Sequence, residues 1–102
     1  MITLCIRYEI DQNKHSDFEK YARAWPEPIR RCGGDLIGYF LPTKFAGPTN
    51  SALALISFPN LTAYEKYRDA LTKDPSAVEN VAYVEQSGCI LNEERSLLQR
   101  VP

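Results

Sequence analysis

The first ten residues carry the pattern that most restricts the fold of this chain, a strict alternation of two sets of side chains. One face of an extended segment would carry Ile2, Leu4, Ile6, Tyr8 and Ile10. The other face would carry Thr3, Cys5, Arg7 and Glu9. A two-residue period is that of a β-strand with one face on a core, so we predict a strand over residues 1–10.

The next segment predicts a helix interrupted by proline. Residues 11–13 offer polar N-cap side chains. Apolar residues then recur at three- and four-residue spacing, namely Phe18, Tyr21, Ala22, Trp25 and Ile29. Pro26 and Pro28 each remove a backbone N–H, so the helix should break after Trp25 and resume for about one turn. The glycine pair at 33 and 34 should end it.

Three further strands are predicted. Residues 36–41 and 52–58 are short apolar runs rich in strand formers, and residues 89–98 alternate well enough for a last strand despite a polar middle. The run at 52–56 scarcely alternates, which indicates a central strand whose two faces are both covered by protein.

Two more helices are predicted between the third and fourth strands. Asn60 caps the first of them, and its buried stripe would be Leu61, Tyr64, Tyr67 and Leu71. Asp74 and Pro75 start a shorter helix that runs to about Glu85 and is stopped by Gly88. This shorter helix would bury Ala77, Val78, Val81 and Ala82.

The order of these elements is that of a split βαβ fold. We therefore predict an α+β, ferredoxin-like sandwich with helices on one face of an antiparallel sheet. The other face would expose either Leu53 and Leu55 or Ala54 and Ile56, and an apolar face of this size usually marks a partner surface. A homodimer that closes sheet on sheet would cover that face and enclose a cavity.

Composition narrows the classes of partner. Twelve Lys and Arg against 13 Asp and Glu over 102 residues give a net charge of -1, without a basic run, so we expect neither nucleic acid nor a membrane as partner. Three widely spaced cysteines and the lack of a signal peptide favour a reducing cytoplasm over a disulfide scaffold. We expect residues 1–102 to form one domain.

Seven short motifs, taken in their order and spacing, resemble those of the NIPSNAP family. They are Ile6-Arg7-Tyr8, Phe18-Glu19, Tyr21-Ala22-Arg23-Ala24-Trp25, Gly33-Gly34, Gly38-Tyr39-Phe40-Leu41-Pro42, Ser57-Phe58-Pro59 and Glu94-Arg95-Ser96. The resemblance covers nearly the whole chain, fits bacterial single-domain members better than animal ones, and implies a dimeric α+β barrel of ferredoxin-like subunits. That superfamily also holds cofactor-free monooxygenases, isomerases and haem proteins, so the resemblance implies a scaffold and supplies no catalytic residues.

Seven residues are candidates for lining a ligand cavity between the two sheets of the dimer: Cys5, Arg7, Glu9, Trp25, Tyr39, Glu93 and Arg95. Arg7 presents a fork that fits a carboxylate, while apolar walls would hold the rest of an aromatic or anionic ligand. The charged candidates can instead pair across neighbouring strands, with Glu94 as a further partner. Trp25 and Tyr39 can equally belong to the core. His15, the only histidine, has no partners at metal-ligand spacing, so we expect neither metal nor cofactor.

The chain lacks any Ser/His/Asp, Cys/His, metal-binding or phosphate-loop signature. We therefore favour a dimeric binding or interaction module, of unassigned activity, with a small-ligand cavity. The alternative is a cofactor-free enzyme, similar to a monooxygenase or isomerase, that acts on a small aromatic or quinone-like substrate oriented by Arg7. A drug-sized ligand needs an enclosed cavity of roughly 300 Å³ or more, so the enclosure and the volume of the inner cavity separate these interpretations.

Overall fold

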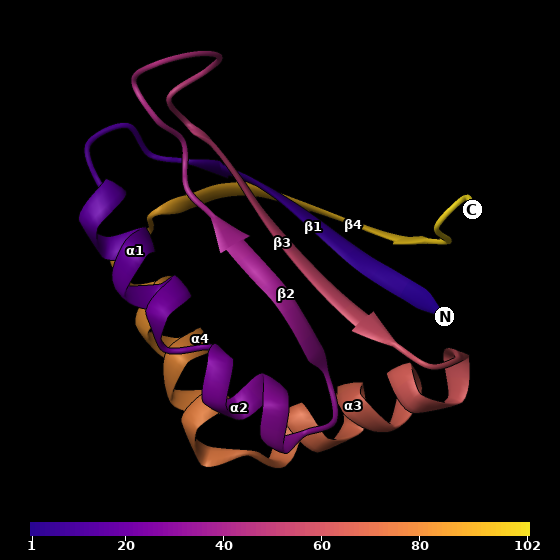
Figure 1. The fold of residues 1–102 in the computed structure, drawn as a ribbon. Helices are drawn as coiled ribbons and strands as arrows, with labels where there is room; N and C mark the ends of the chain where they lie inside the picture. The colour runs from indigo at the N-terminus through magenta and orange to yellow at the C-terminus, as the bar shows by residue number, and fades with distance from the viewer.

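Helices cover one face of a four-stranded antiparallel sheet in the computed structural model, which describes residues 1–102 (Figure 1). The strands, in the sheet order β2-β3-β1-β4, are β1 (Ile2–Ile10), β2 (Asp35–Phe40), β3 (Ser51–Phe58) and β4 (Ile90–Leu98). The helices are α1 (His15–Arg23), α2 (Pro26–Arg31), α3 (Leu61–Lys73) and α4 (Pro75–Ser87). The predicted ferredoxin-like α+β fold is confirmed.

The strand register decides which side chains face the helices. Ile6 of β1 lies opposite Ala54 of β3, and directly opposed residues point to the same side of a sheet. The residues buried on the helix side of these two strands are Leu4, Ile6, Tyr8, Ile10, Ala52, Ala54, Ile56 and Phe58. Leu53 and Leu55 therefore point to the opposite side, which we call the open face because no helix covers it (Figure 1).

The predicted break after the first helix is confirmed, whereas the predicted cap is wrong. α1 ends at Arg23 and α2 begins at Pro26, because proline has no N–H to continue the helical ladder. Lys14 occupies the N-cap position of α1 and makes no side-chain capping bond. The Asp11 carboxylate accepts a hydrogen bond from the Asn13 backbone N–H at 2.9 Å, so it closes a local turn instead.

The turn from α2 into β2 requires both glycines. Gly33 has a φ of +101°, a backbone conformation that residues with a side chain rarely adopt. At Gly34 the need is space, because a Cβ there would lie 2.8 Å from Ile29 Cγ2 and 2.9 Å from Ile56 Cγ2. This close approach lets α2 pack on β2.

α4 departs most from the sequence-based expectation. It extends to Ser87 rather than Glu85, and of its predicted buried residues only Ala77 is buried. Val78 and Val81 are 52% and 42% exposed, and Ala82 is exposed as well. The reason is that α4 packs against α1 and α3 and touches the sheet little.

Hydrogen bonds hold α4 in this position. The buried Asn80 side chain donates from Nδ2 to the Tyr21 carbonyl of α1 at 3.0 Å. The Tyr83 hydroxyl lies 3.2 Å from the Asp17 carboxylate, and Lys14 Nζ donates to the Ser87 carbonyl at 2.6 Å. α4 is thereby anchored to α1 at a distance from the sheet.

None of the helices has both the length and the apolar character needed to cross a bilayer.

Candidate functional site

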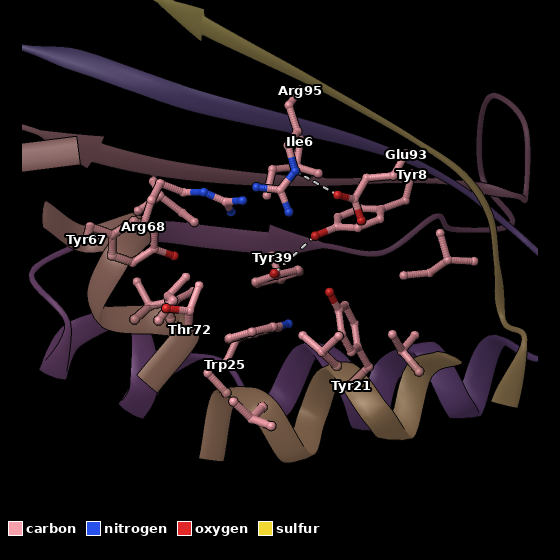
Figure 2. Close-up of a pocket in the computed structure, with 18 of the residues that line it drawn as sticks. Ile6, Tyr8, Tyr21, Trp25, Tyr39, Tyr67, Arg68, Thr72, Glu93 and Arg95 are labelled. Carbon is pink, nitrogen blue, oxygen red and sulfur yellow. Dashed lines mark hydrogen bonds and ion pairs between the residues drawn. The ribbon is translucent and has the colours of Figure 1, made fainter. Parts of the chain in front are cut away.

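The space between α4 and the sheet is a cavity of about 580 Å³ (Figure 2). Its walls are largely aliphatic, with Ile6 and Ile56 from the sheet, Leu71 from α3 and Val81 from α4 among them. The cavity exists because α4 is held by the other helices rather than pressed onto the strands. Val78 and Val81, which the sequence places in the core, form part of its outer wall.

A cluster of aromatic side chains forms the inner wall. The hydroxyls of Tyr8 on β1 and Tyr39 on β2 are 3.2 Å apart and hydrogen-bonded, and their rings stack with centroids 6.1 Å apart. The Tyr21 ring meets the Trp25 ring edge to face at 5.7 Å. In Figure 2 the Tyr21 hydroxyl and the Trp25 indole nitrogen both point toward the space beneath Tyr39.

The tyrosine hydroxyls of this cluster stay protonated at neutral pH. Burial raises the pKa of Tyr8, and the neighbouring Tyr39 and Tyr21 raise it further. Burial likewise raises the pKa of Tyr21, Tyr39 and Tyr67. The cluster therefore presents neutral hydroxyls, which can donate or accept hydrogen bonds but cannot serve as bases.

Trp25 carries an unsatisfied donor. Its side chain is only 6% exposed and lines the cavity, and Nε1 makes no hydrogen bond of normal geometry, although it lies near enough to the Tyr21 hydroxyl to lower the pKa of that hydroxyl against the larger effect of burial. A buried N–H without an acceptor costs about 1–3 kcal/mol relative to a satisfied one. A bound molecule with an acceptor atom could remove this cost.

Charged side chains line the cavity on the side of the sheet and at its rim. Glu93 and Arg95 of β4 lie opposite Tyr8 and Ile6, so they face the helices, and Arg95 Nε donates to Glu93 Oε2 at 2.7 Å. Partial burial disfavours the charge on Arg95, but the Glu93 carboxylate outweighs it and the pKa of Arg95 is raised. Arg68 of α3 is exposed, makes no ion pair, and extends into the cavity from the other side (Figure 2).

The structure divides the seven residues predicted for one cavity between two faces of the sheet. Trp25, Tyr39, Glu93 and Arg95 line the cavity described above. That cavity lies between the sheet and the helices of one chain, so these four residues do not face the space between two sheets for which they were predicted. The cavity between the sheets of a dimer stays a prediction. Cys5, Arg7 and Glu9 lie on the open face, where alternation along β1 placed them.

The open face holds these three residues in different environments. Cys5 is buried beside Leu55, whereas Arg7 and Glu9 are exposed. Arg7 lies opposite Glu94 in the ladder but forms no ion pair, so the predicted pairing of Arg7 with Glu93 or Glu94 is not observed. Glu93 pairs with Arg95 on the other face instead, because the register of β4 places both there. Arg7 lines a second, smaller hollow of about 280 Å³ whose other walls include Phe40 and Leu53.

Sequence reasoning missed Tyr8, Tyr21, Tyr67 and Arg68 as residues of the site. A signal was present at Tyr8, since a tyrosine within an apolar strand face needs a partner for its hydroxyl. Arg68 gave no signal, because its role depends on how far α3 and α4 stand from the sheet.

Comparisons with known proteins agree with this fold. The NIPSNAP family model matches residues 3–102. No curated protein matches the sequence.

Solved structures resemble the chain over nearly its whole length. A protein from Agrobacterium tumefaciens superposes with a TM-score of 0.84 at 20% identity, covering 99% of this chain and 94% of that one. A NIPSNAP family protein from the same organism gives 0.81 at 23% identity, covering 98% and 92%. A protein described as a putative antibiotic biosynthesis monooxygenase, from Nitrosomonas europaea, gives 0.70 at 9% identity and covers both chains completely. At these identities the likeness establishes the fold.

Proposed function

The chain belongs to the NIPSNAP family, and from that premise we propose that it binds a small aromatic molecule in the cavity between the sheet and α4. The observation that carries the proposal is the cavity itself. Its volume of about 580 Å³ falls within the range of small-molecule sites, roughly 300–1,000 Å³. Its walls combine aliphatic and aromatic side chains with a few convergent polar groups, as such sites do.

The wall chemistry favours an aromatic ligand over an aliphatic one. Tyr21 and Trp25 are held at right angles to each other, and Tyr39 stands across from them, so a ring in the cavity would meet both ring faces and ring edges. The rings are fixed by their mutual packing, so little conformational freedom remains to be lost on binding.

Trp25 provides the test, because it is the only tryptophan in the chain. A set of aromatic fragments added to the protein should quench or shift Trp25 fluorescence in a saturable manner. Val81→Phe, which places a ring in the outer wall, should abolish this response, whereas Leu61→Phe on the exposed side of α3 should preserve it. A screen without any saturable response from the folded wild-type protein would refute the proposal.

A second candidate function is that of a cofactor-free enzyme acting on a quinone-like substrate. The similarity of the fold to the Nitrosomonas europaea protein favours it, as does the aromatic and polar character of the cavity. It ranks lower because the tyrosines are held protonated and Glu93 is engaged by Arg95, which leaves no evident proton acceptor on the inner wall. If the protein increases oxygen uptake by 1,4-naphthohydroquinone above background, the enzyme function is favoured over binding alone.

We also propose that the open face packs against the same face of a second copy. The face combines apolar Leu53, Leu55 and half-exposed Phe40 with charges of both signs on β1 and β4. A two-fold arrangement can set Arg7 of one copy near Glu94 of the other, so the surface is self-complementary. The hollow beside Arg7 offers space for a side chain of the second copy.

We propose, in addition, that the protein resides in the reducing environment of the cytoplasm. All three cysteines are free thiols, and two of them, Cys5 and Cys89, are buried. Unpaired thiols of this kind are typical of proteins kept in reducing compartments.

A further inference from the structure

We infer that the ligand of this cavity is an aromatic acid that also carries an oxygen acceptor on its ring, an inference that rests on the proposed function. Its carboxylate would lie between Arg68 and Arg95, and its ring oxygen would accept a hydrogen bond from Trp25 Nε1.

Trp25 lies at the inner end of the cavity. In Figure 2 its indole nitrogen points into the space below Tyr39, toward the side on which the Tyr21 hydroxyl lies. The side chain is 6% exposed, and Nε1 makes no hydrogen bond of normal geometry even to the nearby Tyr21 hydroxyl, so neither the protein nor bulk water satisfies this donor well. An indole N–H only donates, so the ligand atom that meets it must be an acceptor.

The other end of the cavity holds two guanidinium groups. Arg95 uses Nε to bind Glu93, and its two terminal nitrogens make no hydrogen bond to the protein. Arg68 binds no protein group through its side chain. In Figure 2 the two side chains extend toward each other, one from α3 and one from β4. Two like charges facing one space favour an anion between them, and the guanidinium fork matches a carboxylate.

The remaining polar groups do not offset this surplus of donors. The hydroxyls of Tyr8 and Tyr39 are hydrogen-bonded to each other, and Glu93 is engaged by Arg95. Glu85 is exposed on α4 at the edge of the cavity. A cationic ligand would therefore find no unpaired carboxylate on the inner wall, whereas an anion finds two guanidinium groups.

Three naphthalene probes separate the two ends of the cavity. 6-Hydroxy-2-naphthoate carries both groups, 2-naphthoate lacks the ring oxygen, and 2-naphthol lacks the carboxylate. Calorimetric titration of the wild-type protein should give the tightest dissociation constant for 6-hydroxy-2-naphthoate. Each group should contribute about fivefold or more, since one hydrogen bond to a buried or charged donor is worth about that ratio.

Two variants test separately which residue binds the ligand at each end of the cavity. Trp25→Phe should weaken binding of 6-hydroxy-2-naphthoate about fivefold more than binding of 2-naphthoate, because both acids lose contact with the indole ring but only the ring oxygen loses its donor. Arg68→Gln should weaken both acids about tenfold and leave 2-naphthol unchanged. Tyr64→Phe and Arg30→Gln, which lie outside the cavity, should bind all three probes as the wild-type protein does.

The outcomes distinguish this inference from the proposed function. Equal affinity of the wild-type protein for all three probes would overturn the inference and leave the proposed function standing. Equal losses of both acids in Trp25→Phe would overturn the assignment of the indole donor. Absence of binding of every probe to the folded wild-type protein would overturn the inference and contradict the proposed function as well. The comparison of probes on the wild-type protein decides the matter even where a variant fails to fold.

Discussion

Single residues in this protein often serve more than one element, and Asp74 is an example. It ends α3, and its Oδ1 accepts hydrogen bonds from the backbone N–H groups of Ser76 and Ala77 in the first turn of α4. Arg31 of α2 pairs with the same carboxylate at 3.0 Å. Three helices thus meet at one side chain. Its role as a cap was predictable from the Asp-Pro sequence, whereas its pairing with Arg31 depends on tertiary packing.

The pH dependence of stability should reflect this carboxylate. The N–H of Ala77 lowers the pKa of Asp74, burial opposes this in part, and Arg31 assists it. A lowered folded-state pKa means that the stabilisation is present above the unfolded value of 3.8 and is lost as the pH falls through the lower folded value. Asp74→Asn keeps a capping oxygen but no charge, so its thermal midpoint should fall less than that of the wild-type protein between pH 6 and pH 2.5. Equal falls would contradict the role given to the charge.

At the scale of elements, sequence patterns predicted which strands and helices form but not how far α4 lies from the sheet. Alternation in β1 fixed its two faces, and Asn60 and Gly88 marked helix ends as expected. The spacing of Val78 and Val81 indicates an apolar stripe, but it cannot tell a helix that packs on a sheet from one that walls a cavity. That difference rests on contacts such as the Asn80 hydrogen bond, which joins residues far apart in sequence.

The candidate site, too, depends on contacts between distant residues that sequence patterns do not reveal. Trp25, Tyr39, Glu93 and Arg95 were recognised as candidates, yet the sequence does not reveal the register that turns the β4 charges toward the helices. Arg7 was the more obvious candidate from its forked side chain, and it lies on the other face.

Removal of the Asn80 side chain tests what holds α4 in place. Asn80→Ala leaves the buried Tyr21 carbonyl without its donor and should lower the free energy of unfolding by about 1–3 kcal/mol. Gln86→Ala, an exposed change on the same helix, should alter it by less than about 0.5 kcal/mol. Urea denaturation of both variants measures these values. A loss in Asn80→Ala no larger than that in Gln86→Ala would show that the anchor is unimportant.

At the scale of the whole molecule, the two faces of the sheet have different roles in this account. The covered face supplies the core and the cavity, and the open face is the surface that we propose packs against a second copy. This division explains why the chain can carry consecutive polar residues from Asn92 to Ser96 on β4 without losing its core. Those on the helix side line the cavity, and those on the open side border the proposed interface.

Charge placed on the open face should break the dimer. Leu55→Glu introduces a carboxylate beside the buried Cys5, so it should dissociate the protein or unfold it, because interface and core are adjacent there. Leu61→Glu, at a position 53% exposed on α3, should leave the assembly intact. Sedimentation equilibrium at micromolar concentration measures both. A wild-type protein that sediments as a stable monomer would contradict the proposed dimer.

The proposed function requires that a ligand enter between the sheet and α4 and contact Trp25. A two-dimensional ¹⁵N–¹H spectrum tests it directly, because the sole tryptophan gives a single indole N–H signal. On titration with 2-naphthoate, the account predicts that this signal and the backbone amides of Tyr39 and Val81 shift together, while those of Arg7 and Leu53 stay in place. Shifts confined to the open face, with the indole signal of Trp25 unchanged at saturation, would contradict it.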